Sequence, residues 1–205
     1  HESDVPPTTR FLVDNYGDSD EMSVGHRIMF FDIEVEVTDG FPDVQKAQNV
    51  ITSIALYDCL TDKYFTYCFD PEKRIKSYTK DDEVVEFYDT EYEMLNKFFQ
   101  KYLEIRPTII SGWNSEFFDI PYLYNRAVRI LGPEVANLLS PISQVLYSEY
   151  KKKHTIAGVS SLDYLQLYRQ FTFGQKSSYR LDYIGEVEVG MKKVDYEGTL
   201  NDLYD

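Results

Sequence analysis

Two carboxylates lie two residues apart near the end of an apolar stretch of the chain. Asp32 and Glu34 belong to the run RIMFFDIEVEV at residues 27–37, whose apolar and β-branched composition predicts a buried strand. Alternate residues of a strand project from the same face, so both carboxylates point the same way. A divalent cation such as Mg²⁺ or Mn²⁺ would relieve their repulsion, because these ions prefer oxygen ligands. The alternative is a strand with one solvent-facing side, on which the two acids are merely hydrated.

A third acid lies in the segment GWNSEFFDIPYLYNR, residues 112–126. Asp119 stands at the expected start of a helix, after a short buried strand at 108–113 and a loop. An aspartate at this position can be a simple helix N-cap ahead of Pro121, since proline suits an early helical position. The capping role is compatible with a functional one, because capping fixes the carboxylate in space.

Periodicity predicts the elements that must position these acids. Strands at 50–58 and 62–69 should follow the first and pair with it in antiparallel fashion, and 70–89 should be a loop. A capping box of Thr90 and Glu93 opens a helix whose apolar stripe runs from Met94 to Leu103. The remaining expected elements are a helix at about 119–131, a hairpin at 142–158, and helices at 161–172 and 178–188. This order predicts a mixed sheet with helices on its faces, as in the ribonuclease H-like architecture.

Composition excludes several classes of protein. The chain has 205 residues with 21 Lys+Arg and 35 Asp+Glu, a net charge of −14. The charge balance therefore does not favour a basic nucleic-acid-binding tail or a polybasic membrane patch as the main feature of the chain. The longest apolar runs fall far short of the roughly 18 residues that cross a bilayer, so no membrane partner is expected. Residues 1–25 are polar and acidic and should be a linker or edge segment leading into one domain at 26–205.

Several separated strings resemble one protein family in the family's own order. FFDIEVEV followed by SGWNSEFFDIPYLYNR resembles the first two exonuclease motifs of family B DNA polymerases. The later strings SSLDYLQLYRQF and SSYRLDYIGEVEVG resemble the replicative polymerases of T-even-type bacteriophages. The resemblance implies an α/β fold with a ribonuclease H-like mixed sheet flanked by helices, of the DnaQ-like exonuclease type, with a β-hairpin insertion. It also implies proofreading of a single-stranded 3′ end of DNA, in the cytoplasm of an infected bacterial host.

The resemblance further implies a two-metal site that holds Mg²⁺ or Mn²⁺. Asp32, Glu34 and Asp119 would be the catalytic metal ligands, with Asp32 bridging the two ions. Two-metal hydrolysis of the 3′-terminal phosphodiester would be the reaction.

The same resemblance implies contacts to DNA. Phe41, in the string DGFP, would pack on the 3′-terminal base, and Asn114 would help to hold the terminal nucleotide. The hairpin would touch DNA through its basic tip at Lys151, Lys152 and Lys153. The alternative for this tip is a solvated turn without a DNA contact.

The third exonuclease motif of the family, Tyr-x3-Asp, supplies the last metal ligand and lies beyond the segment that DYEG at 195–198 resembles. In these 205 residues Tyr-x3-Asp occurs only at Tyr16…Asp20 and Tyr78…Asp82, in the wrong order relative to the other motifs. Residues 16–20 also resemble a polymerase palm motif, again out of order, and should form a turn. We therefore expect a domain truncated before its third motif, with Asp163 the first candidate for a substitute ligand.

Two hypotheses about function follow from this. In the first, the chain is the exonuclease part of a phage-type polymerase, weak or inactive alone and completed by the segment or subunit with fingers, palm and thumb. In the second, it is a catalytically incomplete ribonuclease H-like binding subunit that docks onto a polymerase subunit.

Overall fold

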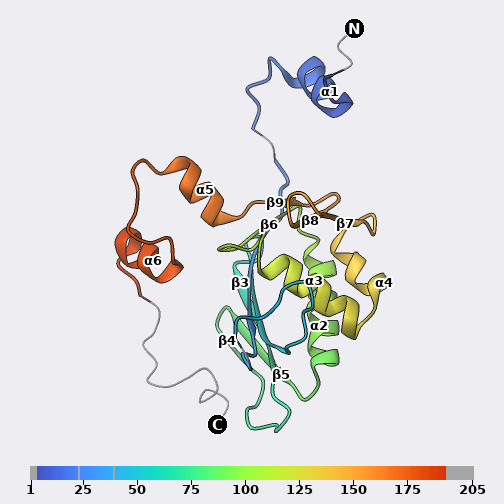
Figure 1. The fold of residues 1–205 in the computed structure, drawn as a ribbon, viewed down its shortest axis with the longest axis vertical. Coiled ribbons are helices and arrows are strands. Elements are labelled where there is room, and N and C mark those ends of the chain that lie inside the picture. The colour runs from blue at the N-terminus through green and yellow to red at the C-terminus, as the bar shows by residue number, and fades with distance from the viewer. Residues whose placement is uncertain (1–3, 23, 39, 193–205) are drawn as a thin grey trace.

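A seven-stranded mixed sheet organises the computed structural model, which describes residues 4–22, 24–38 and 40–192 (Figure 1). The strand order is β4-β5-β3-β2-β1-β6-β9, so β1 is an interior strand. This arrangement confirms the expected mixed α/β class. The strands are β1 (Ile28–Val35), β2 (Ile51–Asp58), β3 (Lys63–Phe69), β4 (Tyr78–Lys80), β5 (Glu83–Tyr88), β6 (Ile109–Ser111) and β9 (Ser160–Ser161).

The first three strands pair in antiparallel fashion, as expected from the sequence. Asp32 of β1 lies opposite Ala55 of β2, and Glu34 lies opposite Ser53. On its other side β1 pairs with β6 in parallel, and β6 pairs in parallel with β9. The first-motif strand therefore has neighbours on both sides, which holds its backbone in place.

The prediction of a loop at 70–89 was wrong for its second half. Strand β5 pairs in parallel with β3, and β4 pairs with β5 in antiparallel fashion at the edge of the sheet. Val84, Val85 and Phe87 carry the β-branched and aromatic signal of a strand. Acidic neighbours such as Glu83 and Glu86 hid that signal, because acidic residues are depleted in strands and make the segment look like a polar loop.

Two helices cover one face of the sheet: α2 (Glu91–Ile105) and α3 (Asp119–Ile130). Thr90 caps α2 as predicted, since its Oγ1 accepts the backbone N–H of Glu93 at 3.2 Å. The apolar stripe of α2 from Met94 to Tyr102 is buried, whereas Leu103, also expected there, is exposed. The main core therefore lies between this pair of helices and the sheet.

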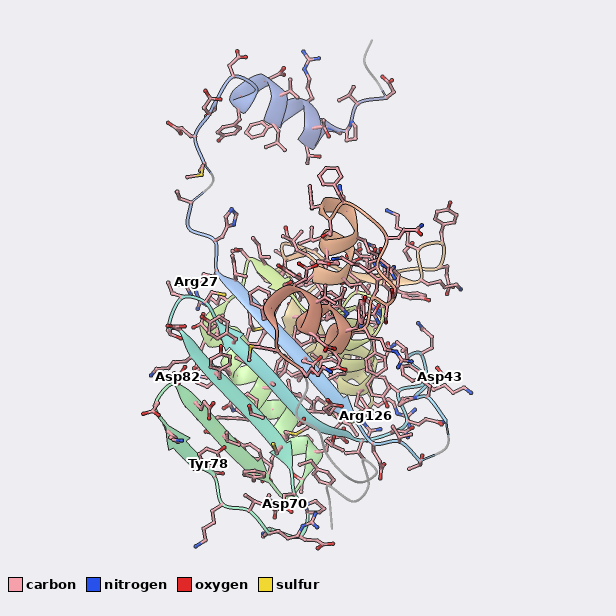
Figure 2. All side chains as sticks on the ribbon, turned by 90° about the vertical axis from the view of Figure 1, so that its left-hand side faces the viewer. Arg27, Asp43, Asp70, Tyr78, Asp82 and Arg126 are labelled. Carbon is pink, nitrogen blue, oxygen red and sulfur yellow. The ribbon has the colours of Figure 1, made fainter. Side chains whose placement is uncertain are left out.

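The chain after α3 contains the predicted hairpin, three short α-helices and a 3₁₀ turn. The elements are α4 (Pro133–Ala136), the 3₁₀ turn η1 (Asn137–Leu139), β7 (Val145–Ser148), β8 (Lys153–Ile156), α5 (Tyr164–Phe171) and α6 (Leu181–Val189). Strands β7 and β8 pair with each other as a separate two-stranded sheet. Helix α6 lies on the opposite side of the main sheet from α2 and α3 (Figures 1 and 2).

The segment expected to be a linker or edge segment contains a helix. Residues Pro7–Tyr16 form helix α1, whose residues are all exposed and which lies apart from the sheet in Figure 1. The predicted turn at 16–20 is present, with the Ser19 N–H donating to the Tyr16 carbonyl at 3.0 Å. The DYEG string at 195–198 lies outside the described residues. Within the described ranges, no helix combines the length and apolar character that membrane crossing requires.

Candidate active site

Strand β1 presents two faces of opposite character. Ile33 and its alternate neighbours are buried beneath α2 and α3, whereas Asp32 and Glu34 project together from the other, solvent-facing side. The same-face prediction is confirmed. Strand β1 is thus an interior strand with one open face, and whether its two acids share a cation or are only hydrated stays a prediction.

Asp119 lies beside this strand although it comes from helix α3. It is the first helical residue, and the N-cap position belongs to Phe118, so the expected capping role is not what holds it. Its Oδ1 instead accepts the backbone N–H of Ile33 at 3.1 Å. The side chain is buried, with the residue only 3% exposed. The second-motif acid is thus bonded to the residue between Asp32 and Glu34.

The end of strand β6 makes room for this contact. β6 pairs with β1 only as far as Ser111, opposite Phe30, and the chain then turns away at Gly112. A Cβ at Gly112 would lie 2.6 Å from the Phe31 carbonyl oxygen, so the close approach of the two backbones requires glycine here. The N–H of Ile33, three residues beyond the last pair, is left for the Asp119 carboxylate.

Burial and neighbouring charge make the Asp119 carboxyl hard to ionise. Burial raises its pKa to about 7, and the negative charges of Asp32 and, to a smaller extent, Asp163 act in the same direction. The hydrogen bond from Ile33 opposes them. A dication next to Asp119 and Asp32 would favour the carboxylate form, because an opposite charge stabilises the ionised group. The donor set of Asp119 and Asp32 therefore fits a hard cation such as Mg²⁺ or Mn²⁺.

The three predicted metal ligands lie less close together than the family resemblance implies. Among residues 4–22, 24–38 and 40–192, no three His, Cys, Asp or Glu side chains gather closely enough to hold a metal ion. Asp32, Glu34 and Asp119 are neighbours in the fold without forming such a group. Their role as joint ligands remains a prediction.

Comparison with known proteins decides the family. Residues 17–184 match the family described as DNA polymerase family B, exonuclease domain. The chain belongs to this family. It is 34% identical to the DNA-directed DNA polymerase of Escherichia phage RB69 over 86% of the chain, and 33% identical to that of Enterobacteria phage T4 over 83%. DNA polymerase 1 of Saccharolobus solfataricus is 29% identical over 84%. The chain spans 23%, 22% and 19% of these relatives, respectively.

The aromatic residue that the family resemblance assigns to the terminal base is exposed. Phe41 is 81% exposed, and its ring centroid lies 5.2 Å from that of Phe118. Phe118 packs in turn on Tyr122 at 5.6 Å and directly precedes Asp119. The ring of Phe41 is therefore placed beside the start of α3, with most of its surface available to a ligand.

Asn114 occupies the turn between β6 and α3. Its backbone is left-handed, with φ of 65°, and its carbonyl accepts the N–H groups of Phe117 and Phe118, each at 3.2 Å. Asn114 thus shapes the loop that delivers Asp119 to β1.

The three lysines predicted to touch DNA have different surroundings. Lys151 and Lys152 lie in the exposed turn of the β7–β8 hairpin, and Lys152 pairs with Glu149 at 3.1 Å. Lys153 lies within β8, and its Nζ contacts both carboxylate oxygens of Glu116, at 3.0 and 3.1 Å. Lys153 therefore joins the hairpin to the second-motif segment, and its positive charge is already matched.

His154 directly follows the three lysines of the hairpin. It is a buried residue of β8, with its ring between Tyr124 at 4.9 Å and Tyr147 at 5.0 Å. Burial lowers the pKa of its imidazole. The hairpin thus packs on α3 through the contact of His154 with Tyr124, and Lys153 joins it to the loop before α3.

A buried ion pair that no sequence pattern indicated lies beside the start of β2. Arg126 of α3 contacts both oxygens of Glu91 at 2.8 and 2.6 Å, and it also donates to the carbonyls of Ala47 and Gln48. Glu91 in turn accepts the N–H of Ile51. Glu91 lies in an acidic stretch at 81–93, whose composition suggests a solvated surface. Figure 2 shows Arg126 at the end of the sheet from which the loop with Asp43 departs.

Proposed function

We propose that this domain hydrolyses the 3′-terminal phosphodiester bond of single-stranded DNA and thereby proofreads the product of a replicative polymerase. The observation that carries the proposal is the hydrogen bond from Ile33 to Asp119 in a member of the family B exonuclease domains. This bond brings the second-motif acid next to Asp32 on the open edge of β1. Two Mg²⁺ or Mn²⁺ ions, when bound, would activate a water molecule and stabilise charge on the scissile phosphate.

The side chains of this domain have distinct tasks in the proposal. Asp32, Glu34 and Asp119 hold the cations, and the buried Asp119 fixes their position relative to the sheet. Phe41 stacks on the terminal base, a contact that tolerates any base and therefore any mispaired end. Asn114 orients the terminal nucleotide. Lys151 and Lys152 contribute attraction to the phosphate backbone.

The proposed reaction requires residues in addition to those of the first two exonuclease motifs. The 205 residues contain Asp32, Glu34 and Asp119 but hold no Tyr-x3-Asp after them. Two dications side by side repel each other and need enough anionic oxygens around them. The 205-residue polypeptide by itself should accordingly be weak or inactive, and the segment with the third motif, together with fingers, palm and thumb, is the partner that completes it.

The test compares the 205-residue polypeptide with a version extended at its carboxyl end by a family B segment that carries Tyr-x3-Asp. The substrate is a 5′-labelled single-stranded oligonucleotide in Mn²⁺, matched with one whose terminal linkage is a phosphorothioate. We expect the extended chain to shorten the first substrate from its 3′ end, and Asp32→Ala to slow it by about 100-fold or more, the scale of one lost electrostatic group.

Two results would count against the proposal. An extended chain that binds a polymerase subunit yet degrades nothing would favour the binding-module hypothesis. Hydrolysis that survives both Asp32→Ala and Asp119→Ala would place the activity elsewhere.

A further inference from the structure

The segment between β6 and α3 is held from outside by one buried carboxylate. Asp163 is 3% exposed and accepts three backbone hydrogen bonds. Its Oδ1 accepts the N–H of Asn114 at 3.1 Å and of Leu165 at 2.9 Å, and its Oδ2 accepts the N–H of Glu116 at 3.1 Å. One of these bonds caps α5, and the other two fasten the loop that leads to Asp119.

The backbone around Asp163 is itself anchored to β6. The N–H of Leu162 donates to the Ile110 carbonyl and the N–H of Tyr164 donates to the Gly112 carbonyl, each at 2.9 Å. Asp163 therefore projects from a segment that is fixed on both sides. Because this segment is fixed, the carboxylate of Asp163 cannot easily move together with the loop. It can therefore hold the loop in one place.

The loop needs such a support. Asn114 has left-handed backbone geometry, which is uncommon for a residue other than glycine. The N–H groups of Asn114 and Glu116 lie in a partly buried turn, where a donor without an acceptor is costly. Bonds to a carboxylate are stronger than neutral ones, so Asp163 compensates both for burial and for the unusual turn.

We propose that Asp163 is the positioning residue of the second-motif loop, holding residues 112–118 so that Asn114 and Asp119 face the terminal nucleotide. The role in DNA binding rests on the function proposed above. It gives Asp163 a task different from that of the substitute metal ligand expected from the sequence, because both of its oxygens already accept backbone N–H groups.

The decisive variant is Asp163→Ser in the full 205-residue chain. Serine is as good an N-cap as aspartate, so its hydroxyl can still accept the Leu165 N–H and keep α5 in place. The serine side chain is one atom shorter than that of aspartate and has no counterpart of Oδ2, so a hydroxyl that caps Leu165 should not reach the N–H groups of Asn114 and Glu116 on the loop. Asp163→Ala removes all three bonds. Thr90→Ala is the matched control, because it removes the N-cap of α2 without touching the loop.

Two measurements distinguish positioning from simple stability. The first is amide hydrogen exchange at Asn114, Glu116 and Leu165. In Asp163→Ser we expect Asn114 and Glu116 to exchange about tenfold faster, the scale of one lost hydrogen bond, with Leu165 little changed. The second is the affinity for a 5′-fluorescein-labelled single-stranded oligonucleotide, which should fall by about fivefold or more in Asp163→Ser and stay unchanged in Thr90→Ala.

The outcomes separate this inference from the proposed function. Unchanged loop exchange in both Asp163 variants would overturn the inference, and so would a loosened loop with undiminished oligonucleotide affinity. If the unmodified chain and its extended form fail to bind the oligonucleotide at all, the proposed function fails. Hydrogen exchange then still decides whether Asp163 holds the loop.

Discussion

The Oδ1 atom of Asp119 lies 3.1 Å from the backbone nitrogen of Ile33 and accepts its hydrogen bond. A residue of helix α3 thus accepts a backbone N–H of β1 at a position where the neighbouring strand β6 has already ended. The bond fixes the distance between the first and second exonuclease motifs through the backbone rather than through flexible side chains. It also leaves a carboxyl group buried beside Asp32, which is an unfavourable arrangement for the fold alone.

Asp119→Asn should therefore stabilise the metal-free domain. The pKa of Asp119 is raised from 3.8 to about 7, so between these values the folded chain binds more protons than the unfolded chain and stability falls as the pH rises. Asparagine does not ionise, so the variant avoids this loss of stability with rising pH. Its amide oxygen can still accept the Ile33 N–H. We expect a gain of about 1–3 kcal/mol above pH 7 that disappears below pH 4, measured by urea unfolding in chelator.

Asp70→Asn is a control of opposite sign. The hydrogen bond from the Ile75 N–H holds the pKa of Asp70 below its ordinary value. Its contribution to stability is present at neutral pH and is lost as the pH falls through the depressed pKa. This variant should be less stable than the unmodified chain at pH 7. A gain in stability at pH 7 from both substitutions would show that the raised pKa of Asp119 is not the cause.

The sequence was sufficient to predict the parts of the site that depend on local pattern. Alternation placed Asp32 and Glu34 on one face, and the capping box located the start of α2. Asp119 could be placed at a helix start, but its bond to Ile33 spans 86 residues and depends on where β6 ends. No local pattern reports such a contact.

The two residues whose surroundings the sequence did not reveal, Glu91 and Lys153, have one physical feature in common. Glu91 looks solvated among its acidic neighbours, and its burial becomes visible only once α3 brings Arg126 against it. Lys153 looks like one of three equivalent basic residues until Glu116 lies beside it. In both cases the charged residues that are neighbours in the sequence suggested an exposed surface. The role of Glu91 and of Lys153 is instead decided by the oppositely charged residue that the fold brings beside it.

Arg126→Met should strongly destabilise the domain. It leaves Glu91 buried without its partner, a situation that typically costs about 3–5 kcal/mol. The double variant Glu91→Gln with Arg126→Met should recover part of this loss, because the uncompensated charge is gone. Lys152→Met, at the exposed pair with Glu149, is the control and should leave the denaturation midpoint unchanged. Equal effects of Arg126→Met and Lys152→Met would contradict the buried-pair interpretation.

Phe41→Ala should weaken binding of single-stranded 3′ ends without affecting folding. Stacking on one base contributes roughly 1–3 kcal/mol, so the dissociation constant should rise by about 5- to 100-fold. The melting temperature should not change, because the ring is largely exposed. Phe173→Ala, at a phenylalanine that is even more exposed and lies far along the chain, should change neither quantity. A lower melting temperature with unchanged affinity would mean that Phe41 acts in packing against Phe118.

The hairpin lysines should separate into two kinds. Lys151→Ala should weaken oligonucleotide binding for all sequences alike and lower the slope of log affinity against log salt by about one unit, with unaltered stability. Lys153→Met should instead reduce the free energy of unfolding by roughly 1–2 kcal/mol, between the values for exposed and buried pairs. If Lys153→Met changes the salt slope and Lys151→Ala does not, the assignment of roles must be exchanged.

The last prediction concerns metal binding by the 205-residue polypeptide. Asp32, Glu34 and Asp119 bring at most three negative charges, and Asp119 is hard to ionise without a cation nearby. Titration calorimetry should therefore show weak binding of one Mn²⁺ ion or none, and single-stranded DNA should be degraded slowly or not at all. Adding the segment with Tyr-x3-Asp, covalently or as a second chain, should supply the fourth acid and restore both. Rapid degradation by the 205 residues alone, abolished by Asp32→Ala, would contradict this and require that another acid of the domain completes the ligand set.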